Sequence, residues 1–398
     1  MASLRYAKND QHGFIEIIFE ALPERASAKL SAVNPAGDQI EFGLYIENNR
    51  CKSVFFNSYF LDDGYYDFEL ILMHEVVGEA VEPLAGQFRI CNGSSNLASS
   101  LRHAFRANPQ CALSQGPLDS SYFDFLPDNL KPNNYPFQMR ESTMQELRVL
   151  SDKQIASFDQ TGTLILESFF DEADINAAKK VLSSVNDNEL FGFSKGSSQR
   201  IVNLHESYEE LNRLYSNKKL YDVVSDLFGV QAFPCQSLSF INGSTQDAHQ
   251  DTVHLTPFPR GLMCGIWIAI EDVVQGAGEL VFYPGSHTLP AILCSTHQVP
   301  KVDSEDGDYS HFGTVFTPLV NELLSTRPEL ESEQFIAKAG DVLIWQENLI
   351  HGGAPRTIQD QTRMSMVIHA FGEPALIYYD SLGMSGKRDT ALVNSSTD

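Results

Sequence analysis

Two histidines and one aspartate are the residues of this chain whose types and spacing best suit a chemical role. His249 and Asp251 stand two positions apart, and His351 follows about a hundred residues later. Two imidazoles and one carboxylate are the ligand set with which proteins hold non-haem Fe(II) while leaving coordination positions open for oxygen chemistry. These three residues therefore predict an iron site and an oxygenase.

The spacing of the first two residues suits one metal ion if the chain around them is extended. Side chains at positions i and i+2 of a strand point to the same face, so we expect His249 and Asp251 to share a strand and reach the same ion. Residues 236–241 and 265–270 have the composition of strands, and His351 should arrive from a different strand. A His-x-Asp pair alone also occurs by chance in surface loops, so the hypothesis depends on the rest of the chain.

The composition indicates a globular protein without a membrane span. The chain has 398 residues, of which 42% are hydrophobic and 20% charged, which is enough for two domains of ordinary size. It has no run of about eighteen apolar residues, and its first residues are polar and lack a hydrophobic signal core. We expect a cytoplasmic protein with reduced thiols, because no Cys-x-x-Cys pair occurs among its six cysteines: Cys51, Cys91, Cys111, Cys235, Cys264 and Cys294.

The charge argues against some classes of partner. The formal net charge is -24 at pH 7, and a field of that sign opposes association with nucleic acids and anionic membranes. It also argues against a large polyanionic substrate such as a coenzyme A thioester. General solubility explains the same charge without any partner.

Changes of pattern divide the chain into four parts. Residues 1–95 contain short alternating segments between turn residues, which predicts a small β-sandwich accessory domain. Residues 96–147 are punctuated by prolines and predict a linker. Residues 148–385 hold every candidate ligand, and residues 386–398 are expected to form a flexible tail.

The part at 148–385 predicts a mainly β fold with flanking helices. Ser151 and Gln154 form a capping box that starts a helix, and a strand and a second helix, capped by Asp171, follow. After Gly229 the pattern changes to short strands separated by glycine and proline turns. A double-stranded β-helix of the jelly-roll or cupin type would bring the three ligands together at its mouth.

Four motifs of this part, in order, carry a family resemblance: an opening helix and strand at 150–166, the metal motif His249-Gln-Asp251, a strand pair within 267–287, and a distal histidine segment at 340–353. Together they resemble the phytanoyl-CoA dioxygenase family of Fe(II)/2-oxoglutarate oxygenases over about residues 148–380. The resemblance implies the double-stranded β-helix, Fe(II), O2 and 2-oxoglutarate as co-substrate, with ascorbate as a stimulant. It does not cover the first 147 residues.

The resemblance also implies residues for the co-substrate. In the family an arginine after the distal histidine binds the far carboxylate of 2-oxoglutarate; Arg363 occupies that place, and Arg356 is a weaker alternative. A guanidinium fork binds a carboxylate through two parallel hydrogen bonds, and Ser365 would lie on the same strand face. Further wall residues are expected to be Thr252, Gln236 and Trp267, of which the last two equally suit a strand core.

The other histidines of this part have plainer interpretations. His254 is expected just behind the ligands or facing the substrate. His287 is expected to orient a turn or to line the pocket. Ordinary polar roles are expected for His297, His311 and His369.

The predicted reaction is hydroxylation, or oxidative desaturation or ring formation, at an unactivated C–H bond. Asp251 favours these outcomes over halogenation, because related halogenases have a small residue in its place. Residues 290–335 form an insertion that we expect to cover the mouth and set specificity. We expect a small-molecule substrate, such as a saccharide or a secondary metabolite in biosynthesis.

Two other functions stay open at this point. The first is a non-catalytic jelly-roll sensor or binding protein that keeps the metal, and Arg363 beside a complete ligand set argues against it. The second is a cupin-type metalloenzyme that does not use 2-oxoglutarate. Succinate formed without substrate would exclude the first, and metal analysis with a 2-oxoglutarate binding measurement would decide on the second.

Overall fold

The structure is a computed structural model. It describes residues 149–385 except 259, 304–306 and 373–374, and before residue 149 it describes eight strands and Gly37. The chain divides into two compact units, one of Met1–Lys131 with Pro374–Leu376 and one of Pro132–Glu373 with Ile377–Asp398. The predicted tail at 386–398, and most of the predicted linker at 96–147, lie outside the described residues.

The first unit contains two antiparallel four-stranded sheets. One sheet has the order β1-β2-β5-β8 and consists of β1 (Ser3–Ala7), β2 (Phe14–Glu20), β5 (Ser53–Asn57) and β8 (Leu113–Ser114). The other has the order β4-β3-β6-β7 and consists of β3 (Arg25–Val33), β4 (Gln39–Glu47), β6 (Gly64–His74) and β7 (Leu84–Ile90). Strand β8 lies within the segment predicted as a linker, so this sheet continues past the predicted boundary at residue 95.

Helices in the described part of the second unit precede most of its strands: α2 (Asp152–Thr161), α3 (Glu172–Asp187), α4 (Glu209–Tyr215) and α5 (Lys218–Phe228). The predicted capping box starts α2, because the Ser151 side chain accepts a hydrogen bond from the Gln154 backbone and the Gln154 side chain accepts one from the Ser151 backbone. Asp171 caps α3 as predicted. We did not predict α4 and α5.

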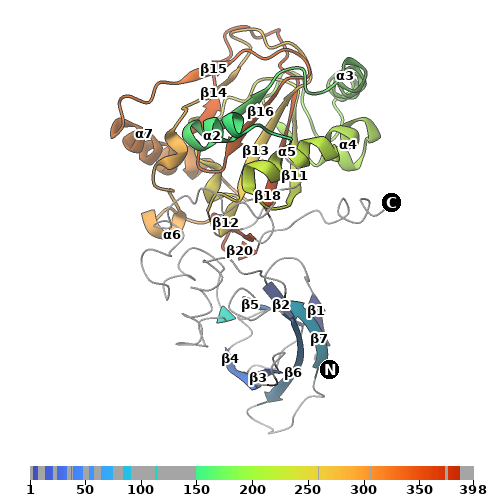
Figure 1. Ribbon diagram of the computed structural model, residues 1–398, viewed down its shortest axis with the longest axis vertical. Helices are drawn as coiled ribbons and strands as arrows, with labels where there is room; N and C mark the ends of the chain where they lie inside the picture. The colour runs from blue at the N-terminus through green and yellow to red at the C-terminus, as the bar shows by residue number, and fades with distance from the viewer. Residues whose placement is uncertain are drawn as a thin grey trace. The chain divides into compact units, whose positions relative to one another are not determined.

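The main sheet of the second unit is antiparallel and has the order β10-β11-β18-β13-β16-β9. Its strands are β9 (Thr163–Leu166), β10 (Arg200–Val202), β11 (Ala232–Phe240), β13 (Met263–Ala269), β16 (Val342–Gln346) and β18 (Ser365–Gly372). The helices lie along one side of this sheet (Figure 1). Alternate residues, such as Ile266, Ile344 and Ile368, join the helices in one apolar core, and each such buried side chain contributes about 2 kcal/mol.

The opposite face of the main sheet forms a second core with a smaller sheet. The smaller sheet has the order β15-β14-β17 and consists of β14 (Leu280–Phe282), β15 (Glu333–Phe335) and β17 (His351–Gly353). Trp267, Leu343 and Val367 of the main sheet pack in this core with Leu280 and Phe335. The candidate ligands lie on this side. A further three-stranded sheet is formed by β12 (Thr256–Phe258), β19 (Leu376–Tyr379) and β20 (Met384–Ser385).

The insertion at 290–335 contains helices rather than an open loop. It includes α6 (Cys294–His297), the π-helical turn η8 (Phe312–Phe316) and α7 (Thr317–Ser325). Phe312 and Phe316 share a small apolar core with Val253 and Ile350. These two residues follow Asp251 and precede His351, so the insertion packs behind the chain segments that carry the ligands.

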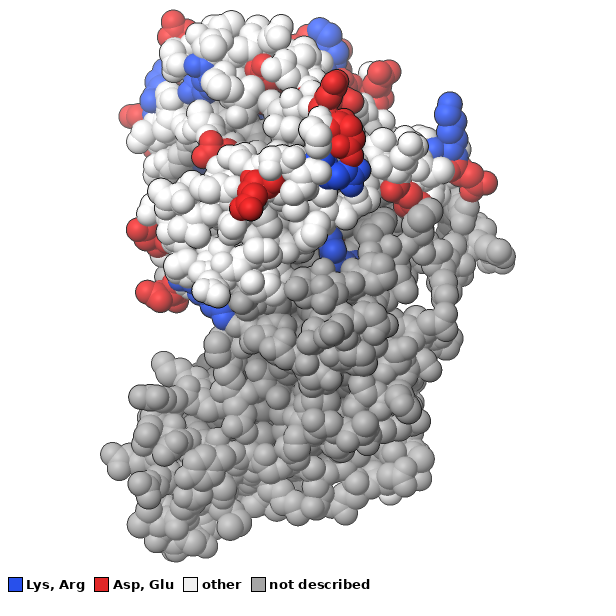
Figure 2. All heavy atoms as spheres, turned by 90° about the vertical axis from the view of Figure 1, so that its left-hand side faces the viewer, with Lys and Arg blue, Asp and Glu red and all other residues white. Residues whose placement is uncertain are grey.

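The exposed charges on one face of the second unit are dispersed. On the face drawn in Figure 2, acidic side chains of the described residues stand among uncharged atoms and near scattered Lys and Arg side chains. Among the described residues, none of the helices has the length and hydropathy that a membrane span requires.

A buried carboxylate ties β16 to the start of β13. Glu347 is fully buried, and its two oxygens accept hydrogen bonds from the backbone nitrogens of Gly261 (2.8 Å) and Met263 (3.0 Å). Burial raises the pKa of Glu347 to about 7, although Arg260 and these hydrogen bonds act in the opposite direction. The folded protein therefore holds a proton on Glu347 that the unfolded chain releases at lower pH.

We expect this carboxyl group to make stability depend on pH. Because its pKa is raised from 4.5 to about 7, its contribution to the free energy of unfolding is present below pH 4.5 and is lost as the pH rises through about 7. Glu347→Gln cannot ionise and should lose this part of the dependence, up to about 3 kcal/mol. Urea unfolding of both metal-free proteins from pH 4.5 to 8 measures the difference, and identical pH profiles would contradict the assignment.

Candidate metal centre

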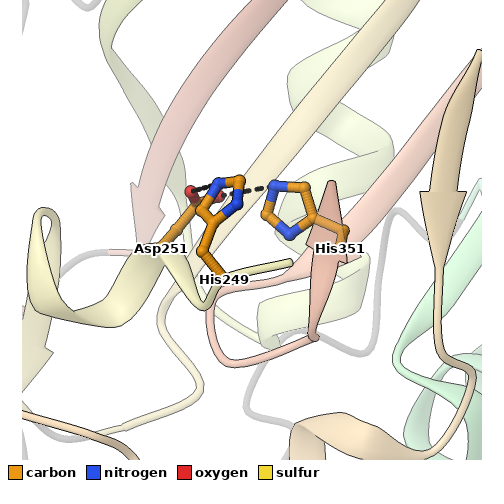
Figure 3. Close-up of side chains that lie close together, drawn as sticks. All are labelled: His249, Asp251 and His351. Carbon is orange, nitrogen blue, oxygen red and sulfur yellow. Dashed lines mark ion pairs between the residues drawn. The ribbon is translucent and has the colours of Figure 1, made fainter. Parts of the chain in front are cut away.

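His249, Asp251 and His351 meet because two chain segments pair through their backbones. The backbone nitrogen of His249 donates to the carbonyl of His351 (2.9 Å), and the nitrogen of His351 donates to the carbonyl of His249 (3.0 Å). The two rings lie 4.4 Å apart between centroids. One ligand atom from each of the three residues lies within 4.8 Å of the others (Figure 3).

The predicted strand through His249 and Asp251 is wrong in part. His249 makes an isolated bridge, and Asp251 begins the short helical turn η6 (Asp251–Val253). Gln250 between them is extended, with φ -109° and ψ 137°. One extended residue is enough to turn both side chains to the same side, so the reason for the spacing holds without a continuous strand. His351 does begin a strand, β17, as expected.

Backbone carbonyls fix the orientation of both ligand imidazoles. Nδ1 of His249 lies 2.8 Å from the carbonyl of Asp247, and Nδ1 of His351 lies 3.0 Å from the carbonyl of Leu349. A carbonyl oxygen only accepts, so each Nδ1 carries the proton and each Nε2 offers its lone pair to the shared space. This arrangement fits a bound metal ion.

The charges at the site also fit a metal ion. Burial alone would raise the pKa of Asp251, but His351, His249 and His369 bring it well below its usual value. Burial lowers the pKa of His351 to about 4. An ionised carboxylate with a neutral imidazole at neutral pH is the protonation state that metal binding requires.

The three ligands line a cavity of about 330 Å³, and Arg363 lines it as well. The Arg363 side chain is buried, with its guanidinium carbon 5.6 Å from the ring centroid of Phe240 and 5.4 Å from that of Trp267. Nη1 donates to the hydroxyl of Ser365 (3.2 Å), whereas Nε has no hydrogen-bond partner.

Arg363 also lacks a carboxylate partner, since no acidic side chain of the described residues lies within 4.0 Å of it. Burial lowers its pKa to about 10, against the effect of Glu279 and Glu271, so it stays charged at neutral pH. A buried, unpaired guanidinium fits a ligand carboxylate such as that of 2-oxoglutarate.

Of the other residues predicted to bind the co-substrate, some line the cavity and some do not. Gln236 and Trp267 line the cavity. Thr252 does not line it, because its hydroxyl turns away and donates to the carbonyl of Glu347 (3.1 Å) and to Oδ1 of Asn348 (3.1 Å); this corrects its predicted place. Arg356 lies outside the cavity and donates to backbone carbonyls, including that of Gln359 (2.8 Å).

Two histidines take places compatible with their predictions. His254 lines the cavity, with Nδ1 3.1 Å from the Ser381 hydroxyl, and burial lowers its pKa to about 3. His287 orients a turn: it is buried outside the cavity, with Nε2 3.1 Å from the carbonyl of Asp159. His297 and His311 do not line the cavity.

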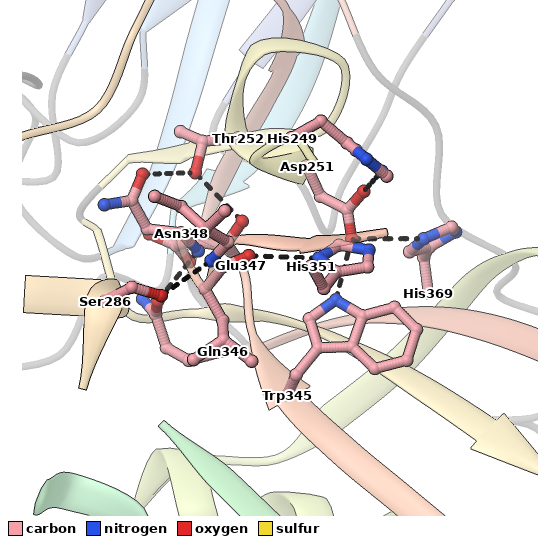
Figure 4. A network of polar contacts seen from close by, with 12 residues as sticks. His249, Asp251, Thr252, Ser286, Trp345, Gln346, Glu347, Asn348, His351 and His369 are labelled. Carbon is pink, nitrogen blue, oxygen red and sulfur yellow. Dashed lines mark hydrogen bonds and ion pairs between the residues drawn. The ribbon is translucent and has the colours of Figure 1, made fainter. Parts of the chain in front are cut away.

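His369 is the residue that the sequence reasoning missed. We predicted an ordinary polar residue, but the structure places it in the cavity wall with Nε2 3.7 Å from Oδ2 of Asp251 (Figure 4). The indole nitrogen of Trp345 donates to the same oxygen at 2.8 Å. Strand parity could have found His369, because it lies six residues after Arg363 and therefore on the same face.

The mouth of the cavity is formed by more than the predicted insertion. From the described residues of 290–335, Tyr309 alone lines the cavity, and its ring stands 5.8 Å from that of His254. Arg200 and Val202 of β10, together with a segment after β19, complete the lining. That the insertion sets specificity stays a prediction.

Removal of the carboxylate should abolish iron retention. Asp251→Ala leaves two neutral imidazoles and no charge to balance a divalent cation. Loss of a mere hydrogen-bond partner of a metal ligand already lowers metal affinity about 10-fold or more, so we expect less than a tenth of the parent iron content after desalting. Asp247→Ala is the matched control, since Asp247 is exposed and contributes its backbone carbonyl to His249. Metal analysis decides, and equal iron in parent and Asp251→Ala would contradict the assignment.

Comparisons with known proteins agree with this geometry. Residues 158–365 match the family described as Phytanoyl-CoA dioxygenase (PhyH). The Phytanoyl-CoA dioxygenase domain-containing protein 1 of Danio rerio is 24% identical in an alignment of 193 residues that covers 35% of this chain and 66% of that protein. Its namesake in Rattus norvegicus is 26% identical over 130 residues, 32% of this chain and 39% of that protein. The chain thus spans less than two thirds of the length of either relative.

Solved structures give weaker likenesses. The non-heme alpha ketoglutarate dependent carbocyclase SnoK is 17% identical with a TM-score of 0.44, over 57% of this chain and 86% of that one. EctD from S. alaskensis with bound Fe is 19% identical with a TM-score of 0.45, over 61% and 83%. The family match covers more than half of the chain. The chain therefore belongs to the phytanoyl-CoA dioxygenase (PhyH) family.

Proposed function

We propose that this protein hydroxylates, or oxidatively desaturates or cyclises, an unactivated C–H bond of a small molecule on a double-stranded β-helix. The observation that carries the proposal is the shared cavity: a His-Asp-His ligand set and a buried arginine, which has no ion-pair partner among the described residues, line the same space. The ligand set suits Fe(II), and the arginine suits a co-substrate carboxylate.

The resident iron, when bound with 2-oxoglutarate, supplies the oxidation, in which the use of O2 is coupled to decarboxylation of 2-oxoglutarate to succinate and CO2. The residues of the chain supply geometry. His249, Asp251 and His351 would hold the iron, and because all three line the cavity, the iron would be open to the co-substrate and substrate there. Asp251 fills the place that a small residue takes in related halogenases, which supports hydroxylation or desaturation.

Arg363 would bind the far carboxylate of 2-oxoglutarate. Its guanidinium is restrained by Ser365 and by the rings of Phe240 and Trp267, so little conformational freedom is lost on binding. The apolar surroundings strengthen the charge-assisted pair because water does not compete for it. Ser365 contributes by holding Nη1 rather than by lining the cavity itself.

The cavity also supports a small substrate with polar groups. One part of its wall is apolar and includes Leu238, Leu280 and Val367, while hydrogen-bonding groups line another part. The polar lining contains His254, Tyr309, Tyr379, Ser381 and Arg200. Such a wall suits a saccharide or a secondary metabolite with hydroxyl or acidic groups, and the net charge of -24 disfavours a polyanionic thioester.

Turnover of the co-substrate tests the proposed function directly. Purified protein with Fe(II), ascorbate and 2-oxoglutarate should form succinate slowly without added substrate, because the proposed ligands of iron and of 2-oxoglutarate line one cavity. Succinate is measured by mass spectrometry against a reaction without iron. If iron-loaded protein neither binds nor consumes 2-oxoglutarate, that result would contradict the proposal. It would favour a binding protein or a metalloenzyme that does not use 2-oxoglutarate.

Substitution of the arginine should raise the requirement for 2-oxoglutarate. Arg363→Ala would remove the buried guanidinium proposed to bind the far carboxylate of 2-oxoglutarate, so the apparent KM for 2-oxoglutarate should rise about a hundredfold or more. Arg356→Ala is the matched control, since that arginine lies outside the cavity. Equal KM values for parent and Arg363→Ala would show that another residue binds the co-substrate.

A further inference from the structure

A row of four residues crosses the main sheet beside Asp251. Gln236 of β11 pairs with His369 of β18, His369 pairs with Gly265 of β13, and Gly265 pairs with Trp345 of β16. Residues that pair directly across strands present their side chains on the same face. The row therefore faces the cavity, which Gln236, His369 and Trp345 all line.

Gly265 makes room in the middle of this row. A Cβ atom at position 265 would overlap the indole ring of Trp345, so only glycine allows the indole to lie across the sheet here. In that place the indole Nε1 donates to Oδ2 of Asp251 at 2.8 Å, and the ring also stands 4.5 Å from that of His351. Because Gly265 has no side chain, the indole of Trp345 can lie where its N–H group reaches the carboxylate of Asp251.

His369 approaches the same carboxylate oxygen from the neighbouring strand. Its Nε2 lies 3.7 Å from Oδ2 of Asp251, and its Nδ1 lies 3.1 Å from the amide nitrogen of Gln236. An amide nitrogen only donates, so Nδ1 accepts and the ring proton sits on Nε2. Gln236 therefore selects the tautomer that turns a second N–H group toward Oδ2.

We propose that Gln236 and His369 are positioning residues for Asp251: with Trp345 they hold Oδ2, so that Asp251 offers Oδ1 to the metal. Oδ1 is the oxygen that faces His249, 3.5 Å from its Nε2, whereas Oδ2 lies 3.7 Å from Nε2 of His351 and of His369 and accepts the indole N–H of Trp345. A carboxylate held by one oxygen occupies one coordination position, whereas binding through both oxygens would take a position that the co-substrate or O2 needs. The inference rests on the iron site of the proposed function.

The row is separate from the co-substrate end of the cavity. Arg363 lies six residues before His369 on the same face, and its guanidinium contacts the rings of Phe240 and Trp267 and the hydroxyl of Ser365 rather than a side chain of the row. Loss of the row should therefore weaken metal binding and leave the contact between Arg363 and 2-oxoglutarate in place. This difference separates a role in holding Asp251 from general damage to the cavity.

The test is a titration of the full-length, metal-free protein with Mn(II) alone, read by the electron paramagnetic resonance of free Mn(II). His369→Leu should bind Mn(II) about 10- to 100-fold more weakly, the range for lost outer partners of metal ligands. Gln236→Leu should weaken binding in the same direction. His369→Gln should stay close to the parent, because its amide nitrogen can donate from the position of Nε2.

Matched variants control for packing. Ile368→Val changes the neighbouring residue of β18, which faces the helices, and should leave Mn(II) affinity unchanged. Gly265→Ala should weaken Mn(II) binding without altering any ligand, because it displaces the indole. If Gly265→Ala does not fold, the pair His369→Leu and His369→Gln still decides. Parent-like affinity in His369→Leu, or equal losses in both His369 variants, would overturn the proposal.

A second measurement reads the tautomer directly. Histidine ¹⁵N chemical shifts of the metal-free protein should show His369 protonated at Nε2, and Gln236→Leu should remove this preference. A proton on Nδ1 in the parent would overturn the proposal. Failure of the proposed function would give a different result. The variants of His369 and Gln236 would change Mn(II) affinity as predicted, but iron-loaded protein would form no succinate.

Discussion

The burial of one carboxylate shapes the site more than any other feature. Asp251 is 7% exposed, and a buried charge without compensation is strongly destabilising. The indole N–H of Trp345 and the Nε2–H of His369 face this carboxylate, and the Nε2 lone pairs of His249 and His351 are placed to share a cation with it. Because the compensating groups come from separate segments, the folded sheet itself assembles the charge balance that iron requires.

One face of the main sheet contributes to stability, and the other face carries the residues of the candidate site. One face joins the helices in a large apolar core, and the other presents alternating residues to the cavity. On β18 this alternation places Val367 and His369 on the inner side and Ile368 on the outer side, and Arg363, two residues before the strand, lines the same cavity. The segment from Arg363 to His369 therefore supplies the candidate co-substrate contact, part of the apolar wall and the neighbour of the ligand carboxylate, while its alternate residues pack in the apolar core.

Much of the site could be predicted from the sequence, because it depends on local spacing. The His249 and Asp251 pair needs one extended residue between its members, and the capping box of Ser151 needs its own turn. Thr252 could not be placed in this way, and for His369 strand parity indicates the face but not the partner. The turn after Asp251 is set by hydrogen bonds to residues 347 and 348, and His369 gains its partner through pairing of distant strands. Helices α4 and α5 and the helical insertion likewise depend on packing that periodicity in short segments does not reveal.

The central claim is that one iron ion and one 2-oxoglutarate bind together in this cavity. The most direct test is an anaerobic titration of the Fe(II)-loaded protein with 2-oxoglutarate, followed by visible charge-transfer absorption. We predict one iron per chain and an absorption band that saturates at one equivalent of 2-oxoglutarate in the parent. An iron-loaded protein that develops no band at any concentration of 2-oxoglutarate would contradict the account.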